Sequence, residues 1–361
     1  MLQLTGLLAL LLARPATSVA QDAPTPPAAV KAGDRVAWIG SSSTNIGVWP
    51  RTVEFLLRTR HPSLKLEFKK FSTGGGTFAT GLANLDAWLN AFPPTLVVFN
   101  YGGNDAGAGR AGLANYLETM GKCIDKARAA GARVILVTPQ AADTRKSGVS
   151  AAKKRTLYAE TMLEQGRLRG WPVVDIHHPL ETLQLANQKI NPSYSILKDK
   201  IHLTDPAYVA WGFLFFDRLN LPLARSEAAI SADGRVVATV HCAIEAAESK
   251  DGVLAFTRID EVLPLLPPGP LPPRHSAPLE AHSRYLLQVE GLSPGNYEIR
   301  CEGRQIGVVP AETLSDGLNL NTLLLDDGQE APWTALARDL WEGRRLEEIG
   351  KTRWRFEIRR R

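Results

Sequence analysis

The first half of the chain alternates between short apolar runs and longer amphipathic segments. Residues 35–39 and 96–100 are almost wholly apolar, which predicts strands, the second of them buried on both faces. Apolar residues at intervals of three and four predict a helix over 116–130 that ends before Gly131. The remaining expected strands are 64–71, 133–138 and 172–176, and the remaining expected helices are 82–92, 151–168, one that begins at Pro50 and one from 205 to about 219.

Strands that alternate with helices require crossover connections, which make the sheet parallel and cover both of its faces. We therefore predict an α/β domain with a three-layer parallel sheet over residues 33–222. From Leu223 the pattern changes to period-two alternation, as in 236–242, 284–290 and 297–302, which predicts an additional C-terminal β-rich module over 223–320. The Pro-rich stretch 263–273 is expected to run extended over the surface, and 321–361 to form a last helix and a basic tail.

The N-terminus differs from the rest of the chain. Leu4–Leu12 is an apolar run, and Ser18-Val19-Ala20 offers small residues at a cleavage site. The run is too short to span a bilayer and predicts a signal peptide over 1–20, followed by a leader or linker over 21–32. No Lys or Arg precedes the run, which departs from the usual signal pattern. We expect a secreted or periplasmic protein without stable membrane insertion.

Composition and charge limit the classes of partner that the protein is expected to bind. With 361 residues, 44% hydrophobic and 22% charged, the chain is an ordinary globular protein. The excess of 42 Lys and Arg over 37 Asp and Glu is mild and shows no dense basic block outside 353–361, so no nucleic-acid partner is expected. The three cysteines lack metal-ligand spacing, and Cys242 and Cys301 are equally consistent with a disulfide and with separate buried thiols. The oligomeric state does not follow from the sequence.

Four polar motifs lie where the chain leaves a predicted strand or enters the last helix of the domain. Sites in parallel sheets lie beyond the carboxyl ends of the strands. Taken singly, each motif has a plainer interpretation, such as a capped turn or a flexible loop. In chain order, they are Gly40-Ser41-Ser42-Ser43-Thr44, Thr73-Gly74-Gly75-Gly76-Thr77, Gly102-Gly103-Asn104-Asp105 and Asp199-Lys200-Ile201-His202.

Each motif has residue types suited to acyl transfer. A serine at a sharp strand-to-helix turn is exposed for attack, and glycine amides or an asparagine carboxamide can donate to a developing oxyanion. A carboxylate three residues before a histidine can hold its Nδ1 and leave Nε2 to take the serine proton. Asp175-Ile176-His177-His178 fits the same pattern. We favour Asp199 and His202 because Thr204-Asp205-Pro206 starts a helix directly after them.

In this order, the four motifs resemble those of the SGNH hydrolases, the GDSL-type esterases and lipases, over about residues 35–219. The resemblance implies a flavodoxin-like fold, Ser42 as nucleophile and His202 as general base oriented by Asp199. It also implies an oxyanion hole made of the Ser42 amide, the Gly75 amide and the Asn104 side chain, with no metal and no cofactor. The family usually has Asp where this chain has Ser41, and the run of three serines leaves the position of the nucleophile open by one residue.

The function implied is that of a secreted serine esterase that hydrolyses carboxylic esters through an acyl-enzyme. The chain has no long apolar lid segment, so short acyl groups are expected, on a small-molecule or carbohydrate ester. Two alternatives remain open from the sequence. One is a catalytically weak or inactive secreted carbohydrate-binding protein on the same fold, and the other is an acyltransferase that uses the same site.

Overall fold

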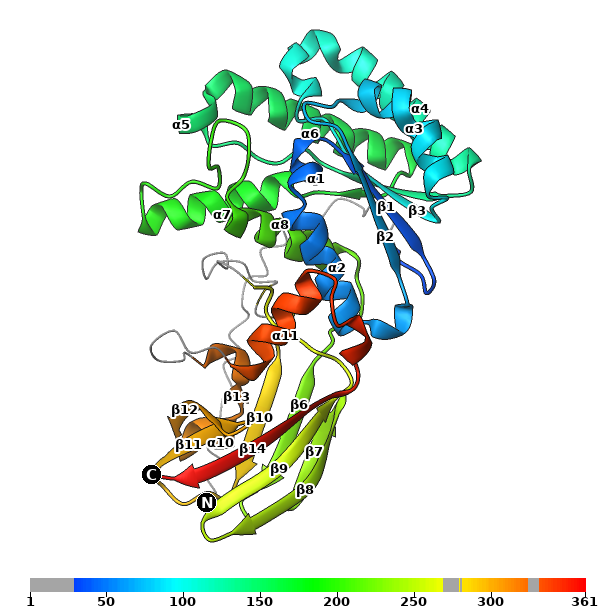
Figure 1. The fold of residues 1–361 in the computed structure, drawn as a ribbon. Helices are drawn as coiled ribbons and strands as arrows, with labels where there is room; N and C mark the ends of the chain where they lie inside the picture. Colours follow the sequence, from blue (N-terminus) through cyan, green and yellow to red (C-terminus); the bar gives the residue numbers. More distant parts are fainter. Residues whose placement is uncertain (1–28, 269–278, 280, 324–330) are drawn as a thin grey trace, which may run out of the picture.

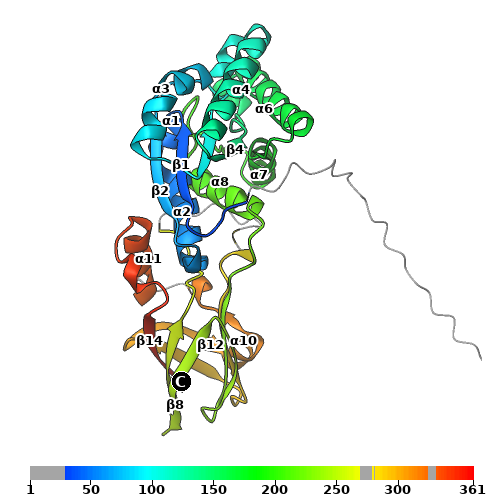
Figure 2. The ribbon, with the colours of Figure 1, turned by 90° about the vertical axis from the view of Figure 1, so that its right-hand side faces the viewer.

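The computed structural model describes residues 29–268, 279, 281–323 and 331–361. Two parts stand end to end in Figures 1 and 2: an N-terminal lobe, in which helices flank a sheet, and a C-terminal module built mainly of strands. The predicted signal peptide, 1–20, and most of the predicted leader lie outside the described residues. Within the described ranges, no helix is both long and apolar enough to cross a bilayer.

The N-terminal lobe is built on a parallel sheet of five strands in the order β2-β1-β3-β4-β5. This order reverses between β1 and β3, and ligands in such sheets bind at that switch point. The structure confirms the predicted parallel α/β sheet. Its strands are β1 (Arg35–Gly40), β2 (Glu67–Ser72), β3 (Leu96–Asn100), β4 (Arg133–Val137) and β5 (Val173–Val174).

Helices cover both faces of this sheet because successive strand residues point to opposite sides. Val36 and Trp38 of β1 join one apolar core, whereas Ala37 and Ile39 join the other. The first core is covered by α2 (Val48–Arg60), α7 (His177–Ile190) and α8 (Asp205–Arg218). The second is covered by α3 (Phe78–Ala91), α4 (Leu113–Ala129) and α6 (Val149–Arg169). The short helices α1 (Ser42–Ile46) and α5 (Thr144–Ser147) follow β1 and β4.

Some element ends differ from the prediction. The helix expected from Pro50 begins at Val48 and is preceded by α1. The strand expected from residue 64 begins at Glu67, because Pro62–Leu64 form a 3₁₀ turn. Helix α7 was not expected, and its start gives little signal, since Ile176 at its N-cap supplies no side-chain cap.

The described part of the C-terminal module contains two sheets, which confirms the predicted β-rich character. One has the order β13-β10-β6-β7 and the other β12-β11-β14-β9-β8, and the described pairs are antiparallel except for β10 with β6. The strands are β6 (Ser226–Ser231), β7 (Val236–Val240), β8 (Cys242–Lys250), β9 (Val253–Asp260), β10 (Tyr285–Glu290), β11 (Asn296–Cys301), β12 (Arg304–Pro310), β13 (Leu318–Asn319) and β14 (Thr352–Arg360), with the short helix α10 (Ala311–Asp316) after β12.

The thiols of Cys242 and Cys301 are separate and buried. Cys242 begins β8 and Cys301 ends β11, and two strands, β9 and β14, lie between these strands in the sheet. The interpretation as separate buried thiols, left open by the sequence, is therefore the one that the structure supports.

The last segment of the chain joins the module to the lobe. Strand β14, the predicted basic tail, pairs with β9 and β11 in the interior of its sheet. Helix α11 (Pro332–Trp341) lies between the two parts of the molecule (Figure 1). Its Trp333 packs edge-on against Tyr285 of the module, and its Trp341 contacts Phe55 of α2.

The predicted surface course of the Pro-rich stretch is wrong for its described part. Leu263 and Leu265 are fully buried, and residues 269–273 of this stretch lie outside the described residues. Both leucines belong to the apolar core, and the buried Arg60 of α2 holds the backbone there, because its guanidinium donates to the Leu265 and His282 carbonyls at 2.8 and 2.7 Å. The stretch therefore forms part of the contact between the lobe and the module.

Candidate active site

Ser42 stands at the beginning of α1, directly beyond the carboxyl end of β1. The tight turn needs Gly40, since a Cβ there would lie 2.2 Å from Thr44 Oγ1 and 2.8 Å from the Asn100 carbonyl oxygen. Ser41 is the N-cap of α1 but makes no capping hydrogen bond. Ser43 is buried and accepts a hydrogen bond of 3.4 Å from the Tyr208 hydroxyl. Of the three serines, Ser42 is the one whose hydroxyl meets a histidine.

That histidine is His202, whose Nε2 lies 3.1 Å from Ser42 Oγ. Its Nδ1 lies 2.9 Å from Asp199 Oδ2, while Asp199 Oδ1 accepts from the backbone N–H groups of Ile201 and His202, both at 2.7 Å. The loop therefore turns back on itself, and a hydroxyl, an imidazole and a carboxylate form one hydrogen-bonded chain. An imidazole held in this way carries its proton on Nδ1 and can accept another at Nε2.

The electrostatics of Asp199 suit an orienting carboxylate. Burial alone raises the pKa of the Asp199 carboxyl, but hydrogen bonds from the His202 and Ile201 N–H groups and from the His202 ring outweigh that effect. The net result is a pKa below the ordinary value of 3.8, so the carboxyl stays ionised even at a pH below 3.8. A persistent negative charge at Nδ1 stabilises an imidazolium at His202 when one forms.

The glycine and asparagine motifs lie beyond the ends of β2 and β3, on either side of the β1 end in the sheet order. Gly75 has φ of 70°, a conformation that favours glycine. Asn104 Nδ2 donates to the Gly76 carbonyl at 2.9 Å, which ties the two motifs together and fixes the carboxamide. An amide nitrogen has two N–H groups, so one remains for a ligand.

Asp105, next to Asn104, holds this turn in place and was not singled out from the sequence. Its carboxylate accepts from the Gly102 N–H at 2.9 Å and from the Phe78 N–H, at the start of α3, at 3.1 Å. Burial raises the pKa of Asp105, against the lowering effect of these two donors. Asp105 thus joins the asparagine motif, to which it belongs, to α3, the helix that follows the glycine motif.

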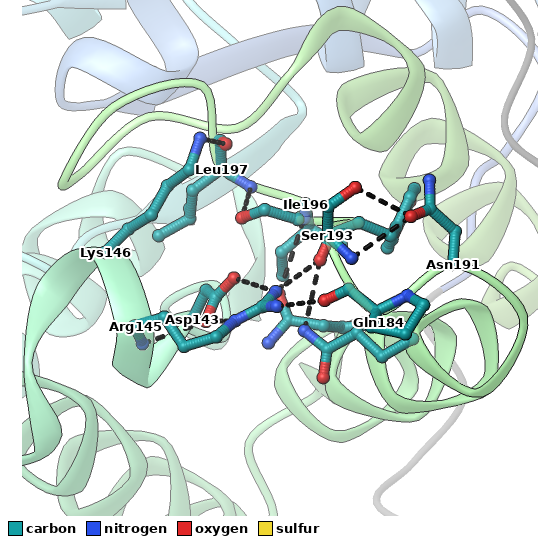
Figure 3. Close-up of polar contacts among 12 residues, drawn as sticks. Asp143, Arg145, Lys146, Gln184, Asn191, Ser193, Ile196 and Leu197 are labelled. Carbon is teal, nitrogen blue, oxygen red and sulfur yellow. Dashed lines mark hydrogen bonds and ion pairs between the residues drawn. The ribbon is translucent and has the colours of Figure 1, made fainter.

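The loop that leads to Asp199 and His202 is anchored by α5 and the residue before it, and Figure 3 shows Asp143, Arg145 and Lys146 at this contact. Asp143 caps α5 by accepting from the Arg145 N–H at 3.0 Å, and its carboxylate also pairs with the Arg145 guanidinium at 2.7 Å. The same guanidinium donates to the carbonyls of Pro192 and Tyr194. An ion pair on one element therefore holds two carbonyls of the loop that leads to Asp199.

Three further donors continue this anchoring toward the histidine. Lys146 Nζ donates to the Leu197 carbonyl at 2.5 Å, and Ser147 Oγ to the Lys200 carbonyl at 2.8 Å. Beyond β4, Gln140 Nε2 donates to the Ile201 carbonyl at 3.2 Å. The roles of Lys146 and Ser147 are not visible in the sequence, because a helix of four residues gives almost no periodic signal.

The second Asp-x-x-His segment forms a pair of its own. Nδ1 of His178 lies 2.7 Å from Asp175 Oδ2, beyond the edge strand β5. The neighbouring His177 is buried, with Nδ1 3.1 Å from the Pro139 carbonyl oxygen and Nε2 3.1 Å from Thr156 Oγ1. Ser42 instead contacts the first segment considered, Asp199–His202, through the His202 ring.

A small recess opens beside Ser42, and among its lining residues are Asn104, Gln140, Arg155 and Ile201. Arg155 comes from α6 and is 7% exposed. Nothing in the sequence marks Arg155, since a single arginine in a polar helix is ordinarily solvated. Its place at the recess is visible only once α6 is packed against the sheet.

Comparisons with known proteins identify the family that the N-terminal lobe matches. Residues 33–210 match the GDSL-like lipase/acylhydrolase family. The chain is 36% identical over 119 residues to esterase TesA of Pseudomonas aeruginosa, a match that covers 30% of this chain and 59% of that esterase. The chain thus spans less than two thirds of the length of this relative.

Two solved structures align with the chain, and the first of them shares its fold. BT4096, a gut microbial diltiazem-metabolizing enzyme, superposes with a TM-score of 0.77 at 16% identity over 94% of this chain and all of that one, so the lobe and the module occur together there. A catalytic mutant of Axe2, an acetylxylan esterase from Geobacillus stearothermophilus, has a TM-score of 0.45 at 16% identity and covers 55% of this chain and 99% of its own. Through residues 33–210, the chain belongs to the GDSL-like lipase/acylhydrolase family, the SGNH hydrolases.

Proposed function

We propose that the protein is a serine esterase that hydrolyses carboxylic esters through an acyl-enzyme, with Ser42 as nucleophile, His202 as general base and Asp199 as the orienting carboxylate. One observation carries the proposal: the hydrogen-bonded chain from Ser42 Oγ through the His202 ring to Asp199, with contacts of 3.1 and 2.9 Å. The family match and the similarity to an esterase support the same reaction class.

In this reaction, His202 Nε2 removes the Ser42 proton as Oγ attacks the ester carbonyl carbon. The amides of Ser42 and Gly75 and the free N–H of Asn104 donate to the oxyanion of the tetrahedral intermediate. His202 then returns the proton to the leaving alcohol oxygen, and the acyl group stays on Ser42. Water, deprotonated by His202, repeats the cycle and releases the acid.

We further propose short acyl groups, with carbohydrate esters among the candidate substrates. The recess beside Ser42 is small and includes the polar side chains of Asn104 and Gln140. A long acyl chain needs an extended apolar wall, whereas a short acyl group and a polar alcohol fit such a lining.

The test is the rate of 4-nitrophenyl acetate hydrolysis by Ser42→Ala, with Ser41→Ala as the matched control. We expect Ser42→Ala to lose on the order of 10⁶ in kcat, because nucleophile and base act as a unit. Ser41 makes no capping hydrogen bond, so Ser41→Ala should keep the fold and most of the rate. Thermal unfolding checks that both variants are folded.

A second readout separates the candidate functions. A fluorophosphonate probe should add its mass to the wild-type protein and not to Ser42→Ala. A folded wild-type protein that neither turns over the ester nor takes the label would replace this proposal with a binding protein that has lost activity. A wild-type protein that transfers the acetyl group to added alcohols in preference to water would instead be an acyltransferase.

The signal peptide predicted over residues 1–20 leads to the proposal that the protein acts outside the cytoplasm. N-terminal sequencing of protein recovered from the periplasm or medium should then begin near Gln21. Recovery of the chain only from the cytoplasm, beginning at Met1, would contradict it.

A further inference from the structure

Three arginines of the described chain have almost wholly buried side chains, and their surroundings differ. Arg258 is 0% exposed and pairs with Asp260 at 2.9 Å. Arg60 is 2% exposed and donates to two carbonyls and to the Thr59 hydroxyl, with contacts between 2.7 and 2.8 Å. Arg155 is 7% exposed, yet within the described residues it forms no ion pair, and its Nη1 is buried without a hydrogen-bond partner.

A buried guanidinium N–H group without a partner is costly, because the group has lost its water and the positive charge has lost part of its hydration. Burial lowers the pKa of Arg155, opposed first by Tyr208 and then by the negative charge of Asp199. Asp199 does not satisfy Arg155, since its two oxygens are held by His202 and by the N–H groups of Ile201 and His202. The buried Nη1 therefore has no hydrogen-bond partner among the described residues, and Asp199 offsets only part of the cost of the buried charge.

The place of this arginine suggests what offsets the cost. Arg155 lines the same small recess as Ser42, Asn104 and Gln140. A molecule that presents its ester carbonyl to Ser42 therefore lies next to the residues that line this recess, Arg155 among them. A neutral oxygen would satisfy an N–H group of Arg155 but would leave its charge uncompensated. A carboxylate satisfies both, and its two oxygens match the fork of a guanidinium.

We propose that Arg155 determines substrate specificity by binding a carboxylate that lies within the same substrate molecule as the reacting ester. The preferred substrates are then anionic esters, with the negative group a few bonds from the carbonyl carbon. This inference rests on the proposed esterase function and narrows the expected substrates to esters that carry a negative charge. Arg155 takes no proton and forms no bond to the reacting carbonyl.

The test compares two pairs of esters that differ only in charge. In the first pair, 3-acetoxybenzoate and 3-acetoxybenzamide, the carboxylate lies on the alcohol side. In the second, monomethyl glutarate and methyl 4-carbamoylbutanoate, it lies on the acyl side. For each pair, the ratio of kcat/KM for the anionic ester to that for the neutral ester is measured, so that general effects on the catalytic groups cancel.

The wild-type protein should favour the anionic member of at least one pair by about 10- to 100-fold, the usual contribution of hydrogen bonds to a charged group. Arg155→Met should bring that ratio close to one, and Arg155→Lys should keep only part of it, because an ammonium lacks the planar fork. Lys153→Met is the matched control, since Lys153 is an exposed cation on the same helix, and it should leave the ratio unchanged.

Inhibition of the wild-type protein provides a measurement that does not depend on how the variants fold. Benzoate should compete with 4-nitrophenyl acetate at concentrations at which benzamide, of the same shape but neutral, does not. Equal inhibition by both, or wild-type ratios near one for both ester pairs, overturns the role of Arg155. A wild-type preference that persists in Arg155→Met overturns it as well.

Ser42→Ala separates this inference from the proposed function. If Ser42→Ala abolishes hydrolysis of all four esters while the wild-type protein shows no charge preference, the esterase proposal stands and only the assignment of Arg155 fails. If Ser42→Ala retains the wild-type rates, the esterase mechanism itself fails.

Discussion

The chain contains two Asp-x-x-His segments with nearly the same internal geometry. In each, one carboxylate oxygen accepts from the N–H groups two and three residues later, and the other meets Nδ1 of the histidine. These Nδ1 contacts measure 2.7 Å at His178 and 2.9 Å at His202. The segments differ in their surroundings, since Asp175 follows an edge strand and leads into α7, whereas Asp199 lies in a loop before α8 that α5 holds.

The comparison separates local from tertiary causes. Four residues are enough to make a carboxylate–imidazole pair, because the contacts lie within one turn of backbone. Whether the free Nε2 meets a hydroxyl depends on the strand order, which puts β1 and Ser42 in the interior of the sheet and β5 at its edge. We therefore expect mutations at equivalent positions of the two segments to have very different effects.

The largest difference is expected between His202→Ala and His178→Ala. Loss of the general base leaves Ser42 without a proton acceptor, so kcat for 4-nitrophenyl acetate should fall on the order of 10⁶. His178 lies on the surface, and His178→Ala should change kcat by less than about threefold. Steady-state kinetics on both variants, with circular dichroism as a check on folding, decide the matter. A large loss in His178→Ala with a small one in His202→Ala would reverse the assignment.

The next difference is expected between Asp199→Asn and Asp175→Asn. Asparagine can still accept from the two backbone N–H groups, but it offers Nδ1 an amide in place of a charge and no longer enforces the tautomer. For Asp199→Asn, we expect a fall in kcat on the order of 10⁴ with KM little changed. Asp175→Asn makes the same chemical change away from Ser42 and should stay within about threefold of wild type. Similar losses in both would show that the carboxylates act through the fold and not through His202.

The sequence predicted the elements that place these segments better than it predicted their contacts. Leu96–Asn100 was expected as a buried strand and is β3, because a wholly apolar run has few other stable environments. Thr204 was expected to start α8, and its hydroxyl accepts from the Ala207 N–H. Both predictions depend only on neighbouring residues in the sequence, so they can be made without knowledge of the fold.

Other features could not be predicted because they depend on residues far apart in the chain. Arg155 looks like a solvated residue until the fold brings its side chain to the recess beside Ser42. The proline-rich stretch is buried through contacts with a distant part of the chain, since Leu263 and Leu265 join the apolar core and Arg60, about 200 residues earlier, binds the Leu265 carbonyl. The position of β14 between β9 and β11 depends in the same way on pairing across the module. The catalytic roles of Ser42, His202 and Asp199, by contrast, remain predictions.

The smallest of these effects is expected from Arg145→Met, which loosens the loop of Asp199 without touching the reacting groups. This variant removes the hydrogen bonds to the Pro192 and Tyr194 carbonyls and the ion pair with Asp143. At about 1 kcal/mol for a typical hydrogen bond, we expect a fall of about 3- to 10-fold in kcat with KM little changed. Arg128→Met, at an exposed position on α4, is the matched control and should not slow the reaction.

The ion pair between Arg145 and Asp143 should also affect how the stability of the protein depends on pH. Hydrogen bonds from Arg145 lower the pKa of Asp143 to about 2, against an ordinary value of 3.8. A carboxyl whose pKa is lowered by folding contributes stability that is complete above pH 3.8 and is lost as the pH falls toward 2. The free energy of unfolding of the wild-type protein should therefore decrease more steeply than that of Arg145→Met between these two pH values. Parallel curves in urea titrations across this range would mean that Asp143 and Arg145 do not hold the loop as an ion pair, and a normal kcat in Arg145→Met would then show that the remaining anchors position His202 unaided.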